Sequence, residues 1–496
     1  MALLVMATAV LSAGSTLAAE ETTENRARLA VEGKNIVFFL LDDATAEDVE
    51  YMPNVQSLLR EQGVTFTRAY SAFPLCCPAR ASILTGNYPH NHRVLGNVDP
   101  LGGFEIFNDP QTFATWINDD YSTALVGKYL NDYADTYRGR RYVPPGWDAW
   151  RASVDPGTYN YLNQTLNIDG ALVDFPGEYS SRLYGRLARE FLDDQGAGPE
   201  PFMLYLSFVA PHNGIPRDPD DQFKGNPYVE PLYRDTYTGP VTPNDLSYNE
   251  ADVSDKQSGV QDNPLLTRRE IARSSEKLVQ RREALRSVDD EIAATIAKVA
   301  SLGELDDTYF ILASDNGYIQ GQHRISRGKS SAYEPSAHVP LIVRGPGLAP
   351  GSEYRGLVGL QDIAPTILTM SKQWRDQREP VMDGRSLLPL VDGTQSTRRA
   401  QLLEVTQRDH LSEQQISRPN DPAATGKVTW VLRGLVTPTG WKYVEYRQSG
   451  GVEMYNLRAD PFEETNRAND PGLSRRQERL DGWLRSLKSC DGLECQ

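Results

Sequence analysis

Runs of consecutive hydrophobic residues alternate along the chain with stretches of helical character. The first run, at 35–41, is continuous in β-branched and aromatic residues, which is typical of a strand buried on both faces. Helices are predicted at 52–63 and across the charged region 267–302. Strands that alternate with helices predict an α/β fold, with a large mixed, mainly parallel sheet sandwiched by helices. Further strand-like runs lie at 64–71, 122–129, 202–211, 307–317 and 339–347.

The pattern changes after about residue 395. Two alternating runs at 428–436 and 441–447 flank a Pro-Thr-Gly turn and predict a β-hairpin. A charged helix is predicted at 473–488. We therefore predict a large domain over 34–395 and a smaller C-terminal α+β subdomain over 396–496 that contains an antiparallel sheet.

The N-terminal segment 1–19 is small and apolar, and its Ala-rich end precedes acidic residues. This pattern predicts a signal peptide and a secreted or periplasmic protein, although the segment lacks a basic start. The alternative is a frayed hydrophobic N-terminus. No later run reaches the length of a membrane span, so we expect none.

The excess of acidic over basic residues limits the classes of molecule that the protein is expected to bind. Acidic residues outnumber basic ones, 67 to 51, and the net charge is −16. Such a surface repels nucleic acid, so we expect no nucleic-acid partner, and an anionic substrate needs a locally basic pocket. The densest basic cluster, Arg268 to Arg286, is interleaved with glutamates and is expected to be a solvated helix face. A small anionic substrate is therefore favoured over a long polyanion.

Polar residues stand where several predicted strands end. The carboxyl ends of parallel strands share one edge of a sheet, where ligands bind. Hard oxygen ligands at two such ends suit Ca²⁺ or Mg²⁺. Either acidic pair alone is more often a cap or turn former, but two pairs in one sheet favour a metal. The predicted ligands are Asp42, Asp43, Asp315 and Asn316.

Basic side chains are predicted near the same edge. Most lysines are solvated and many histidines fill polar niches, so each candidate alone is a weak signal. Near a divalent metal, however, they would form a pocket for a tetrahedral oxyanion, which sulfate and phosphate esters would occupy. The candidates are Arg80, Lys128, His212 and Lys329.

The chain has four cysteines in two pairs. In an exported protein, Cys490 and Cys495 could close a small disulfide loop. Cys76 and Cys77 are adjacent, and neighbouring cysteines bridge each other only with strain. They are also too few for a thiolate zinc cluster, so a role other than bridging is expected.

The segment around these two cysteines resembles the sulfatase signature. Cys76-Cys77-Pro78-Ala79-Arg80 is followed by Leu84-Thr85-Gly86, as in the pattern C-x-P-x-R with a downstream Leu-Thr-Gly. The strings GKY, APH, SDNG and VPLIVRGPG fit in order, and the resemblance runs from about 34 to 485. It is strongest toward the branch of N-acetylglucosamine-6-sulfatases, extracellular endosulfatases and arylsulfatases. It implies an alkaline-phosphatase-like fold, with the catalytic domain over 34–395.

The resemblance also implies roles for single residues. Cys76 would be oxidised to formylglycine by a formylglycine-generating enzyme and would then be the nucleophile and a metal ligand. Asp42, Asp43, Asp315 and Asn316 would hold Ca²⁺, and Arg80 would fix the formylglycine hydrate. Lys128, His212 and Lys329 would bind the sulfate, with His212 or Lys329 protonating the leaving oxygen.

Two departures from the family pattern stand out. Many sulfatases carry a histidine shortly after the lysine of the Gly-Lys string, whereas this chain has Gly127-Lys128-Tyr129-Leu130. Ala79 replaces the usual serine of the signature. Downstream of the nucleophile, His92 and Asn97 are candidates for substrate contact, the alternative being that they brace the helix that begins near Arg80.

The function that we predict is hydrolysis of a small sulfate monoester, of the aryl sulfate or N-acetylglucosamine-6-sulfate type. An alternative is a phosphonate monoester or phosphodiester hydrolase of the same superfamily. A more remote one is a non-catalytic anion-binding protein in which Cys76 stays a thiol.

Overall fold

The computed structural model describes residues 33–135, 138–195, 198, 200–219, 221–373, 381–406, 430–447 and 449–496. The predicted signal peptide at 1–19 lies outside these residues. Among the described residues, no helix combines the length and apolar character that crossing a membrane requires.

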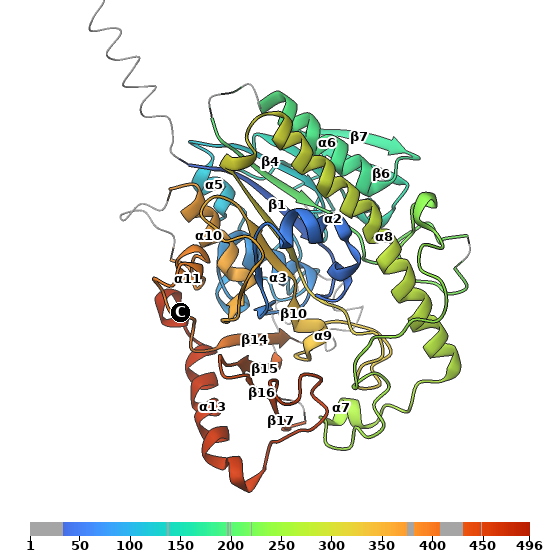
Figure 1. The fold of residues 1–496 in the computed structure, drawn as a ribbon, viewed down its shortest axis with the longest axis vertical. Coiled ribbons are helices and arrows are strands. Elements are labelled where there is room, and N and C mark those ends of the chain that lie inside the picture. The colour runs from blue at the N-terminus through green and yellow to red at the C-terminus, as the bar shows by residue number, and fades with distance from the viewer. Residues whose placement is uncertain are drawn as a thin grey trace, which may run out of the picture.

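A ten-stranded mixed sheet forms the centre of the larger part of the molecule (Figure 1). Its middle is parallel: β1 pairs with β8 and β9, and β4 pairs with β8 and β5. Antiparallel strands extend both sides of this parallel centre. In spatial order the strands are β12 (Ser352–Tyr354), β2 (Val64–Phe66), β11 (Leu341–Arg344), β9 (Thr308–Ser314), β1 (Asn35–Leu41), β8 (Phe202–Ser207), β4 (Ser122–Gly127), β5 (Ala149–Ser153), β6 (Asn163–Ile168) and β7 (Ala171–Pro176).

Helices cover both faces of this sheet. Successive side chains of a strand point to opposite faces, and β1 is fully buried on both. Ile36, Phe38 and Leu40 belong to one core, whereas Val37 and Phe39 belong to the other. The first core includes α3 (Cys76–Thr85), α5 (Phe113–Ile117) and α10 (Ile363–Met370), and the second includes α6 (Ser180–Gln195) and α8 (Arg268–Ser301).

A four-stranded antiparallel sheet lies below the large sheet in Figure 1. The helix α13 (Ser474–Leu487) packs against it, and their apolar residues share a core. Between the two sheets lies a small three-stranded one, of order β10 (His338–Val339), β3 (Ala69–Tyr70) and β13 (Val358–Gly359). The strands of the antiparallel sheet are β14 (Gln401–Thr406), β15 (Trp430–Val436), β16 (Trp441–Tyr446) and β17 (Val452–Asn456).

The remaining helical elements are short. They are the 3-10 helices η1 (Asp48–Tyr51), η3 (Gly157–Tyr159), η4 (Pro231–Tyr233), η5 (Leu305–Asp307), η6 (Leu360–Asp362), η8 (Pro471–Leu473) and η9 (Gly492–Cys495), the π-helical turn η2 (Gln56–Arg60), and the helices α2 (Pro53–Val55), α4 (Pro89–His92), α7 (Ser258–Gln261), α9 (Glu334–Ala337) and α11 (Leu388–Val391).

The predicted fold class is confirmed, a mixed and mainly parallel sheet between helices with a small antiparallel sheet after it. The run 64–71 does not form a single strand, because β2 joins the large sheet and β3 the three-stranded one. The prediction that Arg268 to Arg286 forms a solvated face holds for Arg268 and Arg269, which are exposed, and is wrong for the middle of the helix. Lys277, Arg281 and Arg282 are buried, because the helix packs along the molecule and pairs these cations with groups far away in the sequence.

Candidate active site

Four carboxylate and amide side chains meet at the carboxyl edge of the large sheet. Asp42 and Asp43 follow β1, and Asp315 and Asn316 follow the neighbouring β9. All four are at most 1% exposed. Asp315 Oδ1 accepts hydrogen bonds from the backbone N–H groups of Asp43, at 3.2 Å, and Asn316, at 2.8 Å. The sheet therefore fixes these groups relative to one another before any ligand binds.

The helix α3 begins at Cys76, beside these carboxylates. Cys76 Sγ lies 3.7 Å from Asp42 Oδ1 and 2.9 Å from Lys329 Nζ. Cys77 belongs to the hydrophobic core, and its sulfur accepts a hydrogen bond of 3.0 Å from the backbone N–H of Asn131. The two adjacent thiols thus face different surroundings, and only Cys76 faces the polar groups.

Arg80 lies one helical turn after Cys76 and is completely buried. Its Nε donates to Asp315 Oδ2 at 2.8 Å, and its Nη1 donates to Ser207 Oγ at 2.8 Å and to the carbonyl of Lys128 at 3.0 Å. Buried charges of this kind are stable only when they are paired. Arg80 therefore ties α3 to three strands of the sheet, through residues that follow or end β9, β8 and β4.

Two lysines complete a ring of charge around Cys76. Lys128 Nζ donates to Asp42 Oδ2, and Lys329 Nζ donates to Asp43 Oδ1. Burial alone would lower the pKa of both lysines, but the carboxylates beside them raise it well above the ordinary value. Both lysines are therefore ammonium ions at neutral pH, within reach of an anion at Cys76.

Gly127 makes the approach of Lys128 possible. Its φ is +100°, and a Cβ there would lie 2.0 Å from the carbonyl oxygen of Ser207. Only glycine fits this conformation and this contact.

His212 lies on the loop after β8, with its Nε2 3.7 Å from Asp43 Oδ2. Its Nδ1 is 2.7 Å from the carbonyl of Asn213. Since a carbonyl can only accept, Nδ1 carries the proton and Nε2 offers its lone pair to the site. Burial lowers the pKa of His212 to about 4, despite the opposing effect of Asp43, so the ring is neutral near pH 7.

The sequence reasoning missed Tyr159, which lies against His212. The two rings stack with centroids 4.4 Å apart, and Lys128 Nζ lies 5.0 Å from the centre of the tyrosine ring. Asn131 donates a hydrogen bond of 2.8 Å to the Tyr159 hydroxyl. No motif marks this residue, because it ends the short 3-10 helix η3 and approaches the site only through the tertiary fold.

Arg281 of α8 was also missed. It donates a hydrogen bond of 2.5 Å to the carbonyl of Asp43 and another of 2.5 Å to Asp48 Oδ2. Asp43 has a φ of 69°, a left-handed conformation that aspartate adopts more readily than most residues. Arg281 therefore supports the strained residue that carries one of the carboxylates.

The residues at this edge fit a divalent cation. Ligand atoms of Asp42, Asp43, Cys76 and His212 lie within 4.8 Å of one another. Asn316 Nδ2 donates to Asp43 Oδ1 at 2.7 Å, whereas Asn316 Oδ1 is buried without a hydrogen-bond partner. A buried carbonyl oxygen with no partner is costly, and a hard cation among carboxylates would satisfy it.

The structure places His92 and Asn97 at α3 as braces. His92 Nε2 lies 3.0 Å from Ser82 Oγ, and its Nδ1 accepts a hydrogen bond of 3.1 Å from Val94. Asn97 Oδ1 accepts a hydrogen bond of 3.0 Å from the backbone N–H of Cys77. Both histidine nitrogens are thus used within the protein, which favours the bracing alternative for His92 over substrate contact. The side-chain carbonyl of Asn97 is also used within the protein, by the backbone N–H of Cys77, which favours the bracing alternative for Asn97 as well.

The other predicted cysteine pair lies away from this site. Cys490 and Cys495 form a disulfide beside the C-terminal sheet, in the core that contains α13. After Lys128, at the position where the family pattern has a histidine, Tyr129 and Leu130 are buried in the core.

Comparisons of the sequence with known proteins show the family of this chain, and a comparison of structures shows its fold. A family model described as Sulfatase matches residues 34–372. Human N-acetylglucosamine-6-sulfatase is 30% identical over 93% of this chain and 86% of its own length. An arylsulfatase of Volvox carteri is 29% identical over 93% of this chain and 75% of its own. A protein solved in complex with its substrate D-glucosamine-2-N,6-O-disulfate shares the fold, with a TM-score of 0.69 at 21% identity over 92% of this chain and 98% of that one.

Proposed function

Because the chain belongs to the sulfatase family, we propose that it hydrolyses sulfate monoesters at Cys76, with formylglycine formed from this residue and with a bound divalent cation. The substrates that we propose are aryl sulfates or a 6-sulfate of N-acetylglucosamine. The human relative is named N-acetylglucosamine-6-sulfatase, after the second of these. The resemblance seen in the sequence motif and the family match support the same class of enzyme.

One observation carries this proposal. The ammonium groups of Lys128 and Lys329 and the carboxylates of Asp42 and Asp43 lie around the sulfur of Cys76. Cys76 is the first residue of α3 and is 1% exposed. Lys329 Nζ touches the sulfur at 2.9 Å. Although the chain has a net charge of −16, the cations at this edge are already positioned to bind a tetrahedral anion.

An unmodified thiol would be a poor nucleophile here. Burial raises the pKa of Cys76 to about 11, although Lys128 and Lys329 oppose the rise. The thiolate is the reactive form, and an S-sulfated enzyme would not release its product readily. A formylglycine hydrate supplies two hydroxyls on one carbon, one to attack sulfur and one to expel the sulfate afterwards.

Asp42, Asp43, Asp315 and Asn316 are the residues that would hold the cation, together with residue 76. Bound there, Ca²⁺ or Mg²⁺ would act as a Lewis acid toward sulfate oxygens. Asp315 also binds Arg80, which keeps the carboxylate oriented.

Side chains of the protein bind the sulfate oxygens, supply a proton to the leaving oxygen and position these groups. Lys128 and Lys329 neutralise charge on the non-bridging oxygens, which gives this kind of catalysis much of its rate. Lys329, an ammonium ion at neutral pH, is the candidate for the proton that the leaving oxygen needs, whereas the neutral His212 presents an unprotonated Nε2 to the site and has no proton to donate there. Tyr159 is a positioning residue, since it stacks on His212 and holds the ring in place.

The first test is the mass of the tryptic peptide that contains Cys76, with and without an aldehyde-reactive probe. Exchange of one thiol for an aldehyde oxygen supports the proposal. Two intact thiols, even after co-expression with a formylglycine-generating enzyme, would contradict it.

Turnover then decides the substrate class. The protein should hydrolyse 4-methylumbelliferyl sulfate or N-acetylglucosamine 6-sulfate faster than a matched phosphonate monoester or phosphodiester. A clear preference for the phosphorus ester would favour the alternative hydrolase. Binding of sulfate esters with no turnover, by protein with an intact Cys76 thiol, would favour the anion-binding alternative.

We further propose export from the cytoplasm. The apolar segment 1–19 and the disulfide between Cys490 and Cys495 support this localisation. Cell fractionation of the native host, with N-terminal sequencing of the protein, tests both the destination and removal of the segment.

A further inference from the structure

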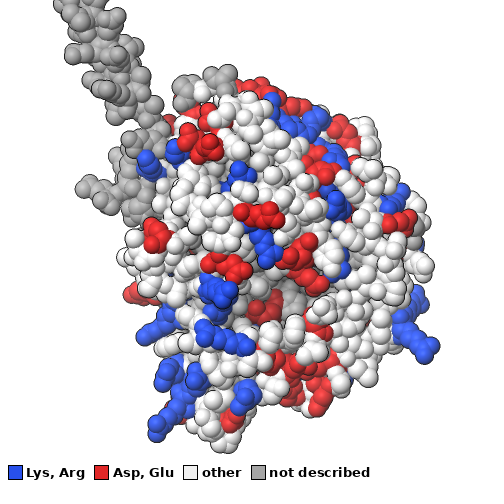
Figure 2. Space-filling model, viewed as in Figure 1, with Lys and Arg blue, Asp and Glu red and all other residues white. Residues whose placement is uncertain are grey.

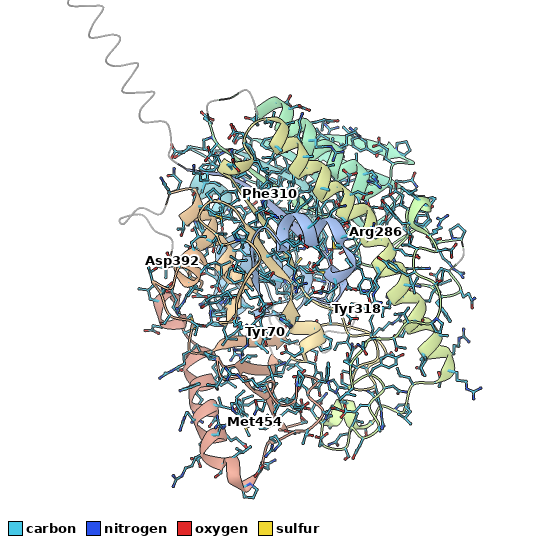
Figure 3. The ribbon with its side chains drawn as sticks, in the orientation of Figure 1. Tyr70, Arg286, Phe310, Tyr318, Asp392 and Met454 are labelled. Atoms are coloured by element: carbon cyan, nitrogen blue, oxygen red, sulfur yellow. A yellow bond between two sulfur atoms is a disulfide. The ribbon has the colours of Figure 1, made fainter. Side chains whose placement is uncertain are left out.

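Arg281 of α8 is a buried cation that contacts the backbone of the candidate cation site. Figure 2 shows acidic and basic side chains interspersed over one face of the molecule, where water can solvate them. Arg281, in contrast, is 2% exposed, so its charge needs partners within the protein. Its guanidinium lies 5.1 Å from the centre of the Tyr318 ring, and Figure 3 labels this tyrosine beside the middle of α8. The protein therefore encloses this cation between α8 and the segment that follows Asn316.

The two acceptors of Arg281 lie at the two ends of one turn. Its Nη2 donates a hydrogen bond of 2.5 Å to the carbonyl of Asp43 and another of 2.5 Å to Asp48 Oδ2. Asp48 also closes the turn, because its Oδ2 accepts from the backbone N–H of Thr45 at 2.9 Å and its own N–H donates to Thr45 Oγ1 at 3.1 Å. The guanidinium therefore fixes Asp43, at the start of the turn, relative to Asp48 at its end.

The backbone of Asp43 is held on both sides of its Cα. Its N–H donates to Asp315 Oδ1 at 3.2 Å, and its carbonyl accepts from Arg281, the one donor to this carbonyl among the residues that the structure describes. Between these two contacts φ is 69°. This conformation costs a residue with a Cβ free energy and persists only where the surroundings enforce it. Arg281 supplies the enforcing contact on the carbonyl side.

The conformation of Asp43 decides where its carboxylate lies. Oδ1 accepts from Lys329 Nζ and from Asn316 Nδ2, and Oδ2 lies 3.7 Å from His212 Nε2. Since the side chain leaves the same Cα, a relaxed φ would swing this carboxylate away from the other predicted ligands. A cation that needs several oxygens at once would then lose one of them or bind in a distorted geometry.

The charge of Arg281 by itself opposes a bound cation. Two positive charges repel each other, and the repulsion grows away from water. A site that needed only negative charge would therefore bind a cation more tightly without Arg281. Asp48 offsets this charge, since both members of the pair are 2% exposed and in contact. What Arg281 adds to the site is thus the geometry of Asp43, and the charge and the geometry predict opposite effects of its removal.

We propose that Arg281 is a positioning residue of the cation site, which sets the affinity for Ca²⁺ or Mg²⁺ by holding Asp43 in its left-handed conformation. The inference rests on the divalent cation of the proposed function and deepens it, because it assigns part of the affinity to a residue that is not a ligand. Contacts that orient metal ligands in this way typically change metal affinity by about 10- to 100-fold.

The test measures binding of Ca²⁺ and of Mg²⁺ to the chelator-treated full-length protein by isothermal titration calorimetry. Arg281→Met removes the guanidinium, and Arg281→Lys keeps the charge on a side chain of different shape and donor geometry. The matched control is Arg282→Met, at the next position of α8. Arg282 is 3% exposed, pairs with Glu47 Oε1 at 2.8 Å and lies 3.7 Å from the centre of the Tyr51 ring. The control thus removes an equally buried charge whose hydrogen bond goes to a residue outside the site.

We expect Kd for the better-bound ion to rise about 10- to 100-fold in Arg281→Met and about tenfold in Arg281→Lys, and to change less than about threefold in Arg282→Met. Arg281→Met also leaves the buried Asp48 without its cation, which destabilises the fold. The double variant Arg281→Met/Asp48→Asn removes both charges of the pair, keeps the net charge of the chain and should show the same weaker binding. Peptide masses verify that residue 76 is in the same chemical state in all of these proteins.

Three outcomes would overturn the inference alone. The first is unchanged affinity in the double variant, and the second is tighter binding in Arg281→Met, which would mean that its charge matters and its geometry does not. The third is equal weakening in Arg281→Met and Arg282→Met, which any loss of a buried charge in α8 would produce. Folded wild-type protein that binds neither ion would refute the cation of the proposed function as well, and the wild-type titration distinguishes that result from the other three.

Discussion

Two clusters of buried charge, one at the carboxyl edge of the large sheet and one beside the C-terminal sheet, differ in how completely their groups are paired. The first, the Cys76 cluster, consists of Asp42, Asp43, Lys128, Lys329 and Cys76. The second, the Lys442 cluster, consists of Lys442 on β16 with Glu334 on α9 and Glu463. Both bury ions that cost free energy to remove from water.

The Lys442 cluster is closed. Lys442 Nζ donates hydrogen bonds of 2.7 Å to the Glu463 carboxylate and to the carbonyl of Ala332, and it forms an ion pair of 2.7 Å with Glu334. Burial would lower the pKa of Lys442, but the two carboxylates raise it. Every charge in this cluster thus has an opposite charge beside it, and the cluster joins the C-terminal sheet to the segment after Lys329.

The Cys76 cluster is open. Its charges also pair, but they surround a neutral sulfur, and the neighbouring Asn316 Oδ1 has no partner. The lone pair of His212 Nε2 also points to this edge. Incomplete pairing of buried groups is costly for folding and is typical of sites that await a ligand. The comparison thus separates a cluster that stabilises the fold from one that is prepared for chemistry.

The largest effect should come from the centre of the open cluster. Cys76→Ala should lower sulfatase activity by at least about a thousandfold, since the nucleophile is lost, and should leave the unfolding midpoint within a few degrees of wild type. Cys77→Ser is the matched control, one residue away in the core, and should retain most of the activity. Initial rates and thermal unfolding of both variants check this. If Cys77→Ser were the inactive one, residue 76 would not be the nucleophile.

Removal of divalent ions should have the next largest effect. Exhaustive treatment with a chelator should lower activity about a hundredfold or more, because the Lewis acid contributes several kcal/mol to the transition state. Calcium or magnesium should restore it, and titration with each ion identifies the better one. Metal analysis of the treated protein shows whether the divalent ions have been removed. If protein without bound metal kept full activity, the carboxylates would serve a purpose other than metal binding.

The sequence was sufficient for the parallel centre of the large sheet and for most of this open cluster. The run 35–41 corresponds to β1 residue for residue, and the strand ends place Asp42, Lys128 and Asp315 at one edge because the strands are parallel. The motif from Cys76 to Gly86 identified the family that the family model confirms.

Contacts between distant segments could not be predicted in the same way. Arg281 is buried because Asp48, 233 residues away, receives its guanidinium, and no local pattern of charges contains that information. Tyr159 reaches His212 from the short 3-10 helix η3, 53 residues before it in the chain. The closed cluster at Lys442 was not foreseen either, because its members come from three separate parts of the chain.

Breaking the closed cluster should affect stability more than chemistry. Lys442→Met leaves two buried carboxylates without their cation and should lower the free energy of unfolding by about 3–5 kcal/mol. The control is Arg355→Met, which breaks an exposed pair with Glu353, 82% and 43% exposed, and should cost less than about 1 kcal/mol. Denaturant unfolding of the holoprotein measures both. Equal stability of the two variants would show that the closed cluster does not hold the C-terminal sheet in place.

The smallest expected effect is a dependence of stability on pH, and it arises from the contacts of His90 with Glu404 and Cys490 in the C-terminal region. His90 Nδ1 lies 2.7 Å from Glu404 Oε2, and its Nε2 lies 2.9 Å from the carbonyl of Cys490. Both partners accept, so the imidazole satisfies both only when each nitrogen carries a proton. Burial lowers the pKa of His90, but the hydrogen bond and charge of Glu404, the hydrogen bond to the carbonyl of Cys490 and the charge of Asp383 together outweigh it, and the net shift is upward.

A raised pKa in the folded state has a definite consequence for stability. The contribution of His90 is fully present below the pKa of the unfolded chain, about 6.5, and is lost as the pH rises through the higher folded value. His90→Gln should therefore cost about 1–2 kcal/mol at pH 5.5 and clearly less at pH 9, as measured by urea unfolding at both pH values. Arg433, which pairs with Glu404 at 2.9 Å, stays charged throughout and cannot produce this difference. A cost that does not change with pH would mean that His90 does not titrate between these pH values in the folded protein, and that its hydrogen bond to Glu404 does not depend on a charged imidazole.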